Sequence, residues 1–204
     1  GAGTVEFNAG TTTIAGSYGI AGTGTTIVQG GTANFNNASA LNFVNLLTVS
    51  SGTLGGSGSL VLDGGLTWSG GTQSGAGSTT VAAGASLSIS GAPQLQTRTF
   101  TSQSTAGVWS GSGTFDMGGT FNNAGTLTAT GDGTMRAFTN PGTFNNSGLF
   151  RKTTGTGATT FNTNNPLTVN NTGTMDIQSG SVSMVPTTFN VDGVVNLATG
   201  TTLL

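Results

Sequence analysis

The strongest constraint on the fold is a motif that recurs along the chain: an aromatic or β-branched residue, two asparagines, a small residue and usually glycine. It begins at Phe121 as FNNAGTL, at Phe144 as FNNSGLF and at Val169 as VNNTGTM, and a decayed copy begins at Phe189 as FNVDGVV. An earlier copy at Phe35 lacks the glycine. The motif thus returns at irregular intervals of about 20–25 residues, which is typical of proteins in which each repeat stacks on the one before it.

Two other sequence words repeat at related distances. An aliphatic residue, two small or polar residues, glycine and then Thr, Ser or Ala begin at Val28 and again, one repeat later, at Val49. The words TWSGG and VWSGS place Trp68 and Trp109 at a separation close to two repeats. The repeat is therefore irregular in length but continues through much of the chain.

Each repeat contains short segments in which apolar and polar residues alternate. Leu87–Ser90 and Ser181–Val185 have this period of two, which directs one face inward and one outward. The separators are Gly-Gly, Ser-Gly, Asn-Asn and Asp-Gly, residues that favour tight bends. No ten-residue stretch has helical periodicity, so the sequence predicts an all-β chain.

Short strands in repeats of this length predict a right-handed parallel β-helix (β-solenoid) of about nine irregular coils, forming a single domain over residues 1–204. At ~4.8 Å per coil the rod would be roughly 40–45 Å long. Inward Val, Leu, Ile and Phe would form columns through the stack, and the Asn side chains would form hydrogen-bonded ladders. A β-sandwich or barrel is the rival fold, because it also consists of short strands separated by regular turns.

Composition excludes several function classes. The chain has four Lys and Arg residues, six Asp and Glu residues, a net charge of −2, and neither His nor Cys. Four scattered cations cannot form the basic patch that a nucleic-acid partner requires. Zinc, haem and disulfide chemistry lack their usual ligands, so we expect no metal and no cofactor. No window approaches the ~20 apolar residues of a membrane span.

Four stretches resemble the repeat regions of large bacterial surface adhesins of the filamentous-haemagglutinin-like and autotransporter-like kind. They are Leu66–Ser90 (LTWSGGTQSGAGSTTVAAGASLSIS), Val108–Phe115 (VWSGSGTF), Phe121–Gly131 (FNNAGTLTATG) and Phe144–Met184. The resemblance covers residues 60–204 well and the first 60 weakly. It implies a secreted, right-handed β-helical stalk at the bacterial cell surface, and it carries no catalytic motif.

We therefore expect a non-catalytic structural or adhesive segment, extracellular or at the cell surface, and a slice of a longer repetitive chain. Two other functions stay open: a carbohydrate-binding or polysaccharide-degrading β-helix module, and a self-assembling extracellular filament subunit. The expected partners are surface glycans or neighbouring copies stacked end to end, since uncapped coils expose unpaired strand edges.

Trp68, Trp109 and Tyr18 are the candidate ligand-binding residues, because exposed aromatic rings can stack on sugars. The two tryptophans occupy equivalent places in repeated words, so the alternative is a packed column two coils apart. No residue is assigned a catalytic role in the favoured interpretation.

A degrading enzyme would need two carboxyl groups about 5–10 Å apart, and Asp116 and Asp132 are the candidates if the loops bring them together. The alternative is that they are solvated turn residues. Arg136, Arg151 and Lys152 are candidates for a small anion contact, but the favoured interpretation is that they are solvated charges that keep the surface soluble. Ice binding is disfavoured, because adjacent Thr pairs such as 25–26 and 79–80 do not recur at one coil length.

Overall fold

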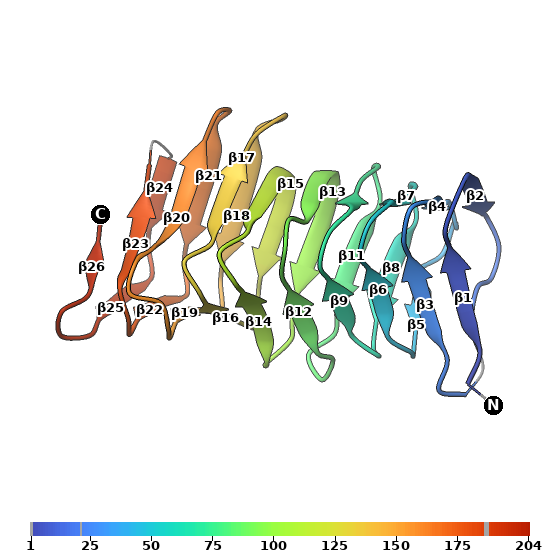
Figure 1. The fold of residues 1–204 in the computed structure, drawn as a ribbon, viewed down its shortest axis with the longest axis horizontal. Coiled ribbons are helices and arrows are strands. Elements are labelled where there is room, and N and C mark those ends of the chain that lie inside the picture. The colour runs from blue at the N-terminus through green and yellow to red at the C-terminus, as the bar shows by residue number, and fades with distance from the viewer. Residues whose placement is uncertain (1, 21, 186–187) are drawn as a thin grey trace.

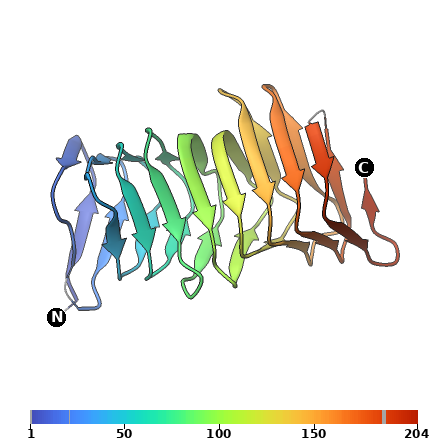
Figure 2. The ribbon, with the colours of Figure 1, turned by 180° about the vertical axis from the view of Figure 1, so that it is seen from behind.

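The computed structural model describes residues 2–20, 22–185 and 188–204, which form strands, turns and bends with no helix among them. The strands stack as the coils of a parallel β-solenoid of about nine turns, with the two termini at opposite ends of the stack (Figures 1 and 2). The predicted fold class is confirmed; right-handed winding stays a prediction from crossover preference.

Three rows of parallel strands run along the stack. Row A consists of β1 (Thr4–Phe7), β3 (Thr25–Val28), β6 (Leu47–Val49), β9 (Leu66–Trp68), β12 (Leu87–Ile89), β14 (Gly107–Ser110), β16 (Thr126–Thr130), β19 (Leu149–Lys152), β22 (Thr174–Ile177) and β25 (Val194–Leu197). Row B consists of β2 (Thr11–Ile14), β4 (Thr32–Phe35), β7 (Thr53–Gly55), β10 (Thr72–Gln73), β13 (Gln94–Ser102), β15 (Thr114–Asn123), β17 (Thr134–Ala137), β20 (Ala158–Thr163), β23 (Ser181–Met184) and β26 (Thr202–Leu203).

Row C begins in the second coil and consists of β5 (Leu41–Phe43), β8 (Ser59–Leu62), β11 (Ser78–Val81), the second halves of β13 and β15, then β18 (Gly142–Asn146), β21 (Leu167–Asn171) and β24 (Thr188–Val191). The long strands β13 and β15 turn the corner between rows B and C and join them into one sheet of 16 strands. In row A, Val49 pairs with Trp68 and Phe150 pairs with Met175, so the length of a coil varies along the stack.

The repeated FNN word is explained by strand alternation in row C. Phe121, Phe144 and Val169 are fully buried in one column, in which the rings of Phe121 and Phe144 lie 5.3 Å apart, edge to face. The first Asn of each word points outward and the second points inward, because successive side chains of a strand face opposite sides. The predicted inward columns are therefore confirmed.

Both asparagines form ladders, as the sequence predicted. In the outer ladder Asn145 Nδ2 donates to Asn122 Oδ1 at 2.8 Å, and Asn170 and Asn190 continue the series at 2.8 and 2.7 Å. A second, buried ladder consists of Asn123, Asn146 and Asn171, whose amides are joined at 2.7 and 2.6 Å. Each inner Asn also donates to the backbone carbonyl of a row A residue in the next coil. The acceptors are Leu149, Thr174 and Val194.

The glycine that follows each FNN word is required by close stacking of the turns. A Cβ atom on Gly148 would lie 2.0 Å from the carbonyl oxygen of Gly125, and one on Gly173 would lie 2.2 Å from that of Gly148. Only a residue without a side chain permits this approach. The glycine thus sets the distance between coils at this corner.

Candidate functional site

The two candidate tryptophans lie in the core. Trp68 is 0% exposed and Trp109 is 3% exposed. Ile89 lies between them in row A, since it pairs with Trp68 on one side and Trp109 on the other. They form the packed column two coils apart that was the alternative interpretation, and neither ring is presented to solvent as a stacking platform.

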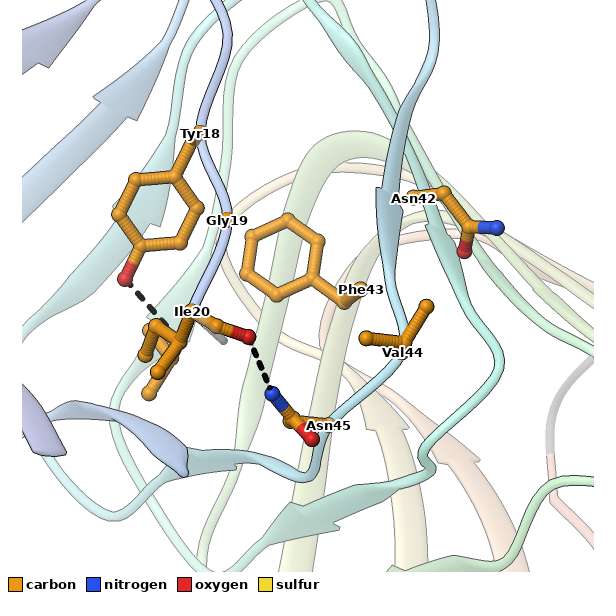
Figure 3. Close-up of a pocket in the computed structure, with 8 residues that line it drawn as sticks. Tyr18, Gly19, Ile20, Asn42, Phe43, Val44 and Asn45 are labelled. Carbon is orange, nitrogen blue, oxygen red and sulfur yellow. Dashed lines mark hydrogen bonds between the residues drawn. The ribbon is translucent and has the colours of Figure 1, made fainter. Parts of the chain in front are cut away.

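Tyr18 is the one candidate aromatic that borders a pocket. Its ring lies 5.3 Å from Phe43 and its hydroxyl is 3.0 Å from Thr26 Oγ1, and both rings are visible in Figure 3. The chain segment that carries Tyr18 lies beside β5 and is held there by Asn45, whose Nδ2 donates to the carbonyl of Ile20 at 2.8 Å. Burial raises the pKa of the Tyr18 hydroxyl, so this group stays protonated at neutral pH.

This pocket encloses about 50 Å³ and is lined by Tyr18, Gly19, Ile20, Thr26, Asn42, Phe43, Val44 and Asn45. That volume holds a few water molecules, whereas ligand pockets measure roughly 300–1,000 Å³. In Figure 3 the side chain of Asn42 points away from the two rings. A broader, open hollow of about 320 Å³ lies nearby, bordered mainly by small side chains of residues 15–17 and 37–41. Neither hollow contains a charged group.

The candidate carboxylates are paired with cations on the neighbouring coil. Asp116 Oδ1 accepts from Arg136 Nε at 2.8 Å, and Asp132 Oδ1 accepts from Lys152 Nζ at 2.6 Å. The two pairs lie in different places on the coil, since Asp116 and Arg136 are on row B strands whereas Asp132 is in the turn between β16 and β17. Each carboxylate therefore has a local partner that accounts for its position.

The three candidate cations for an anion contact do not converge. Arg151 Nε donates to Asp176 Oδ2 at 2.9 Å in row A, while Arg136 pairs with Asp116 in row B. The expectation that Lys152 is a solvated surface charge is wrong, because its side chain is 0% exposed. Lys152 lies in the same inward column as Ala129 and Ile177. The sequence does not reveal this position, because Arg151 and Lys152 together have the pattern of an exposed basic pair.

Lys152 acts as a clamp between the row A and row B sides of the solenoid. Its Nζ donates to Asp132 Oδ1, to the carbonyl of Gly131 at 3.0 Å and to Thr159 Oγ1 at 3.1 Å. Asp132 in turn accepts from the backbone N–H of Gly157 at 3.1 Å. The hydrogen bond from Lys152 holds the pKa of Asp132 below its ordinary value.

Stability is expected to depend on pH through Asp132. A carboxyl group whose pKa is lowered by folding stabilises the native state above its unfolded pKa, and this contribution is lost as the pH falls through the folded pKa, that is, below about 4. Asp132→Asn should unfold at lower denaturant concentration than the wild type at pH 7, and this gap should shrink at pH 3. Urea titrations at both pH values measure it, and an equal gap at both would contradict the assignment.

Arg98 is a second buried cation, and all five of its N–H donors are satisfied. Its Nε donates to Thr79 Oγ1 at 2.8 Å. Its two Nη atoms donate to four backbone carbonyls at 2.7–3.2 Å, those of Gly56, Gly58, Ser74 and Ser78. Burial lowers the Arg98 pKa to about 10, so the group remains charged at neutral pH. Arg98 thereby ties its own coil to the two preceding coils.

A bulge turns Arg98 inward. Gln96 pairs with Gly118 and Thr99 with Thr120, so the spacing along β13 is one residue longer than along β15. Thr97 takes up the extra residue with a φ of 59°, a conformation that side chains rarely adopt. The sequence carries no signal for this bulge, since neither glycine nor asparagine marks it.

The outer surface of row C carries two columns of polar side chains in register. We call it the Thr/Asn surface; its first column contains Ser59, Ser78, Thr99, Thr120, Thr143, Thr168 and Thr188, and its second contains Thr80, Thr101, Asn122, Asn145, Asn170 and Asn190. The two columns lie two residues apart on each strand. Adjacent Thr pairs in the sequence do not reveal these columns, because neighbouring residues of a strand face opposite sides.

Among the described residues, no group of three or more His, Cys, Asp or Glu side chains is placed to hold a metal ion. The same residues contain no helix with the length and apolarity needed to cross a bilayer. Comparison of the chain with protein-family models, with curated proteins and with solved structures finds no match.

Proposed function

We propose that this chain is a non-catalytic structural and adhesive segment, a rigid stalk of a secreted bacterial surface protein. The observation that supports this most is the continuity of rows A and B, which run from the first coil to the last as unbroken parallel ladders (Figure 1). Buried side-chain ladders and the clamps at Arg98 and Lys152 add bonds between coils. Such an arrangement resists bending and separates whatever lies at its two ends.

A spacer should tolerate removal of one whole coil, because its role depends on length and continuity rather than on one constellation of residues. Deletion of residues 144–168 joins Thr143 to Val169, which then takes the place of Phe144, its partner in the register of row C. After the deletion Asn170 stacks directly on Asn122 in the outer ladder, and the Asp116–Arg136 ion pair is unchanged. We expect a cooperatively folding rod that is shorter by about 5 Å, the rise of one coil.

Small-angle X-ray scattering measures the length, and urea unfolding measures cooperativity. The matched control is deletion of residues 144–155, about half a coil, which should fail to fold because it moves inward side chains out of their columns. If the whole-coil deletion fails as badly as the half-coil deletion, the coils are not interchangeable spacer units. The adhesive part is tested by retention of chain-coated beads on glycan-coated surfaces under flow, with uncoated beads as control.

The alternative of a polysaccharide-degrading module has a direct test. Asp116→Asn and Asp132→Asn should leave release of reducing ends from polysaccharides unchanged from the background of the wild-type chain. If the wild type releases reducing ends and either variant loses this activity, the chain is an enzyme and the stalk proposal is wrong.

The self-assembling filament is kept as a second candidate because of the last coil. Leu197 is 50% exposed, whereas Ile177, which precedes it in the same column, is 0% exposed. Val191 is likewise 45% exposed above the buried Asn171. This apolar edge can pack against a second copy of the chain. Light scattering that gives the mass of a single chain at all concentrations would argue against the second copy.

A further inference from the structure

The Thr/Asn surface has the properties of a surface that orders water. Its outward positions carry no charged and no aromatic side chain, so it lacks both the stacking rings of a sugar platform and the charges of an ionic partner. No side-chain hydrogen bond within the described residues engages the hydroxyls of Thr99, Thr120, Thr143 or Thr168. These hydroxyl groups are therefore available to solvent, with a methyl group beside each one.

The asparagine column also keeps hydrogen-bonding capacity toward solvent. Each amide offers two N–H donors and two acceptor lone pairs. Within the ladder, Asn145 uses one donor toward Asn122 and one acceptor site toward Asn170. One N–H and one lone pair remain, and the ladder bonds fix their position. The array is thus rigid and still has hydrogen-bonding groups that are free to bind water.

The spacing of the array is set by the backbone. Successive coils stand ~4.8 Å apart, and two residues along a strand span about 6.6 Å. The rise per coil lies near the repeat along the a axis of hexagonal ice, and the spacing of two residues along a strand is somewhat shorter than the repeat along the c axis. The first column extends over seven coils, from Ser59 to Thr188, and the second over six, from Thr80 to Asn190, so weak contacts at each position add over the whole surface.

We propose that the Thr/Asn surface binds ice, with the Thr hydroxyl and methyl groups and the outer Asn amides ordering a first layer of lattice water. This goes beyond the stalk function and does not depend on it. The water that the array holds in place would merge with the ice lattice, and the rigid coil spacing provides the match along the stack.

The test uses the purified chain, labelled with a fluorophore, on a single crystal of ice grown in its presence, together with thermal hysteresis. We expect the wild type to adsorb to defined ice planes and to depress the freezing point below the melting point. Thr143→Tyr places a bulky ring in the middle of the first column and should abolish most of both effects. Thr120→Lys, which adds a charge to the same column, should do so independently.

The matched control is Thr128→Tyr, an outward, partly exposed threonine of row A that introduces the same ring elsewhere. It should keep the ice activity of the wild type, and circular dichroism melts should show all variants folded. Absence of wild-type adsorption to ice, or equal activity of Thr143→Tyr and the wild type, would overturn the proposal. So would binding to insoluble cellulose or chitin that is lost in Thr143→Tyr, because the surface would then recognise a crystalline glycan.

Discussion

Arg98→Met is expected to lower the free energy of unfolding by about 2–4 kcal/mol, because hydrogen bonds from a charged group contribute more than neutral ones and cannot be replaced by water in the core. Methionine roughly keeps the length of the side chain, so the change isolates the polar contacts rather than a large cavity. It leaves the carbonyl oxygens of Ser74 and Ser78 without the guanidinium that bridges them. The measurement is the midpoint of urea unfolding together with its slope.

Arg151→Met is the control for this experiment. Arg151 carries the same group, but its side chain is 37% exposed, and it forms a single ion pair with Asp176. Exposed ion pairs contribute about 0–1 kcal/mol, so this variant should unfold close to the wild type. Similar small losses in both variants would mean that the Arg98 contacts only offset the desolvation of the guanidinium.

Asn146→Leu is expected to lower the free energy of unfolding by about 2–4 kcal/mol, because it removes hydrogen bonds and also leaves buried polar partners unsatisfied. Asn146 stands in the middle of the inner ladder, where it accepts from Asn123 and donates to Asn171 and to the carbonyl of Thr174. Leucine has a similar volume and removes all three bonds. Asn171 Oδ1 then loses its donor in a site that water does not reach. The midpoint of urea unfolding measures the loss.

The neighbouring residue provides the control. Asn145→Leu makes the same change in the outer ladder, where the side chain is only partly buried and water can replace the lost bonds. Its expected effect is below about 1 kcal/mol. Equal losses for Asn145→Leu and Asn146→Leu would show that the ladders stabilise the coil by strand pairing alone, with no special contribution from the buried amides.

Several features of the fold and the site follow from the repeats. The intervals between copies of the FNN word predicted the coil length, and the two-repeat separation of Trp68 and Trp109 offered a packed column two coils apart as the alternative to a sugar contact. Both are confirmed, since in-register parallel stacking places equivalent residues on top of one another. The Asn ladders follow from the same rule.

The charges and the outer surface could not be assigned in this way. Lys152 was predicted to be solvated and is buried, and Asp116 and Asp132 are ion-paired with the coil that follows. Such partners lie 20 positions apart, a spacing that has meaning only when the exact length of each coil is known. The Thr/Asn surface was overlooked because its residues alternate with core residues instead of adjoining one another.

The sequence by itself determined the coil period, the inward columns and the asparagine ladders, because stacking rewards the same residue type at the same place in every coil. Only the tertiary structure decided the environment of Arg98. Its acceptors at Gly56 and Gly58 are 42 and 40 residues away, and a bulge at Thr97 turns its side chain toward them. The physical reason is that this cation binds backbone carbonyls of the two preceding coils. Every residue has a carbonyl group, so the sequence does not show which carbonyls will accept.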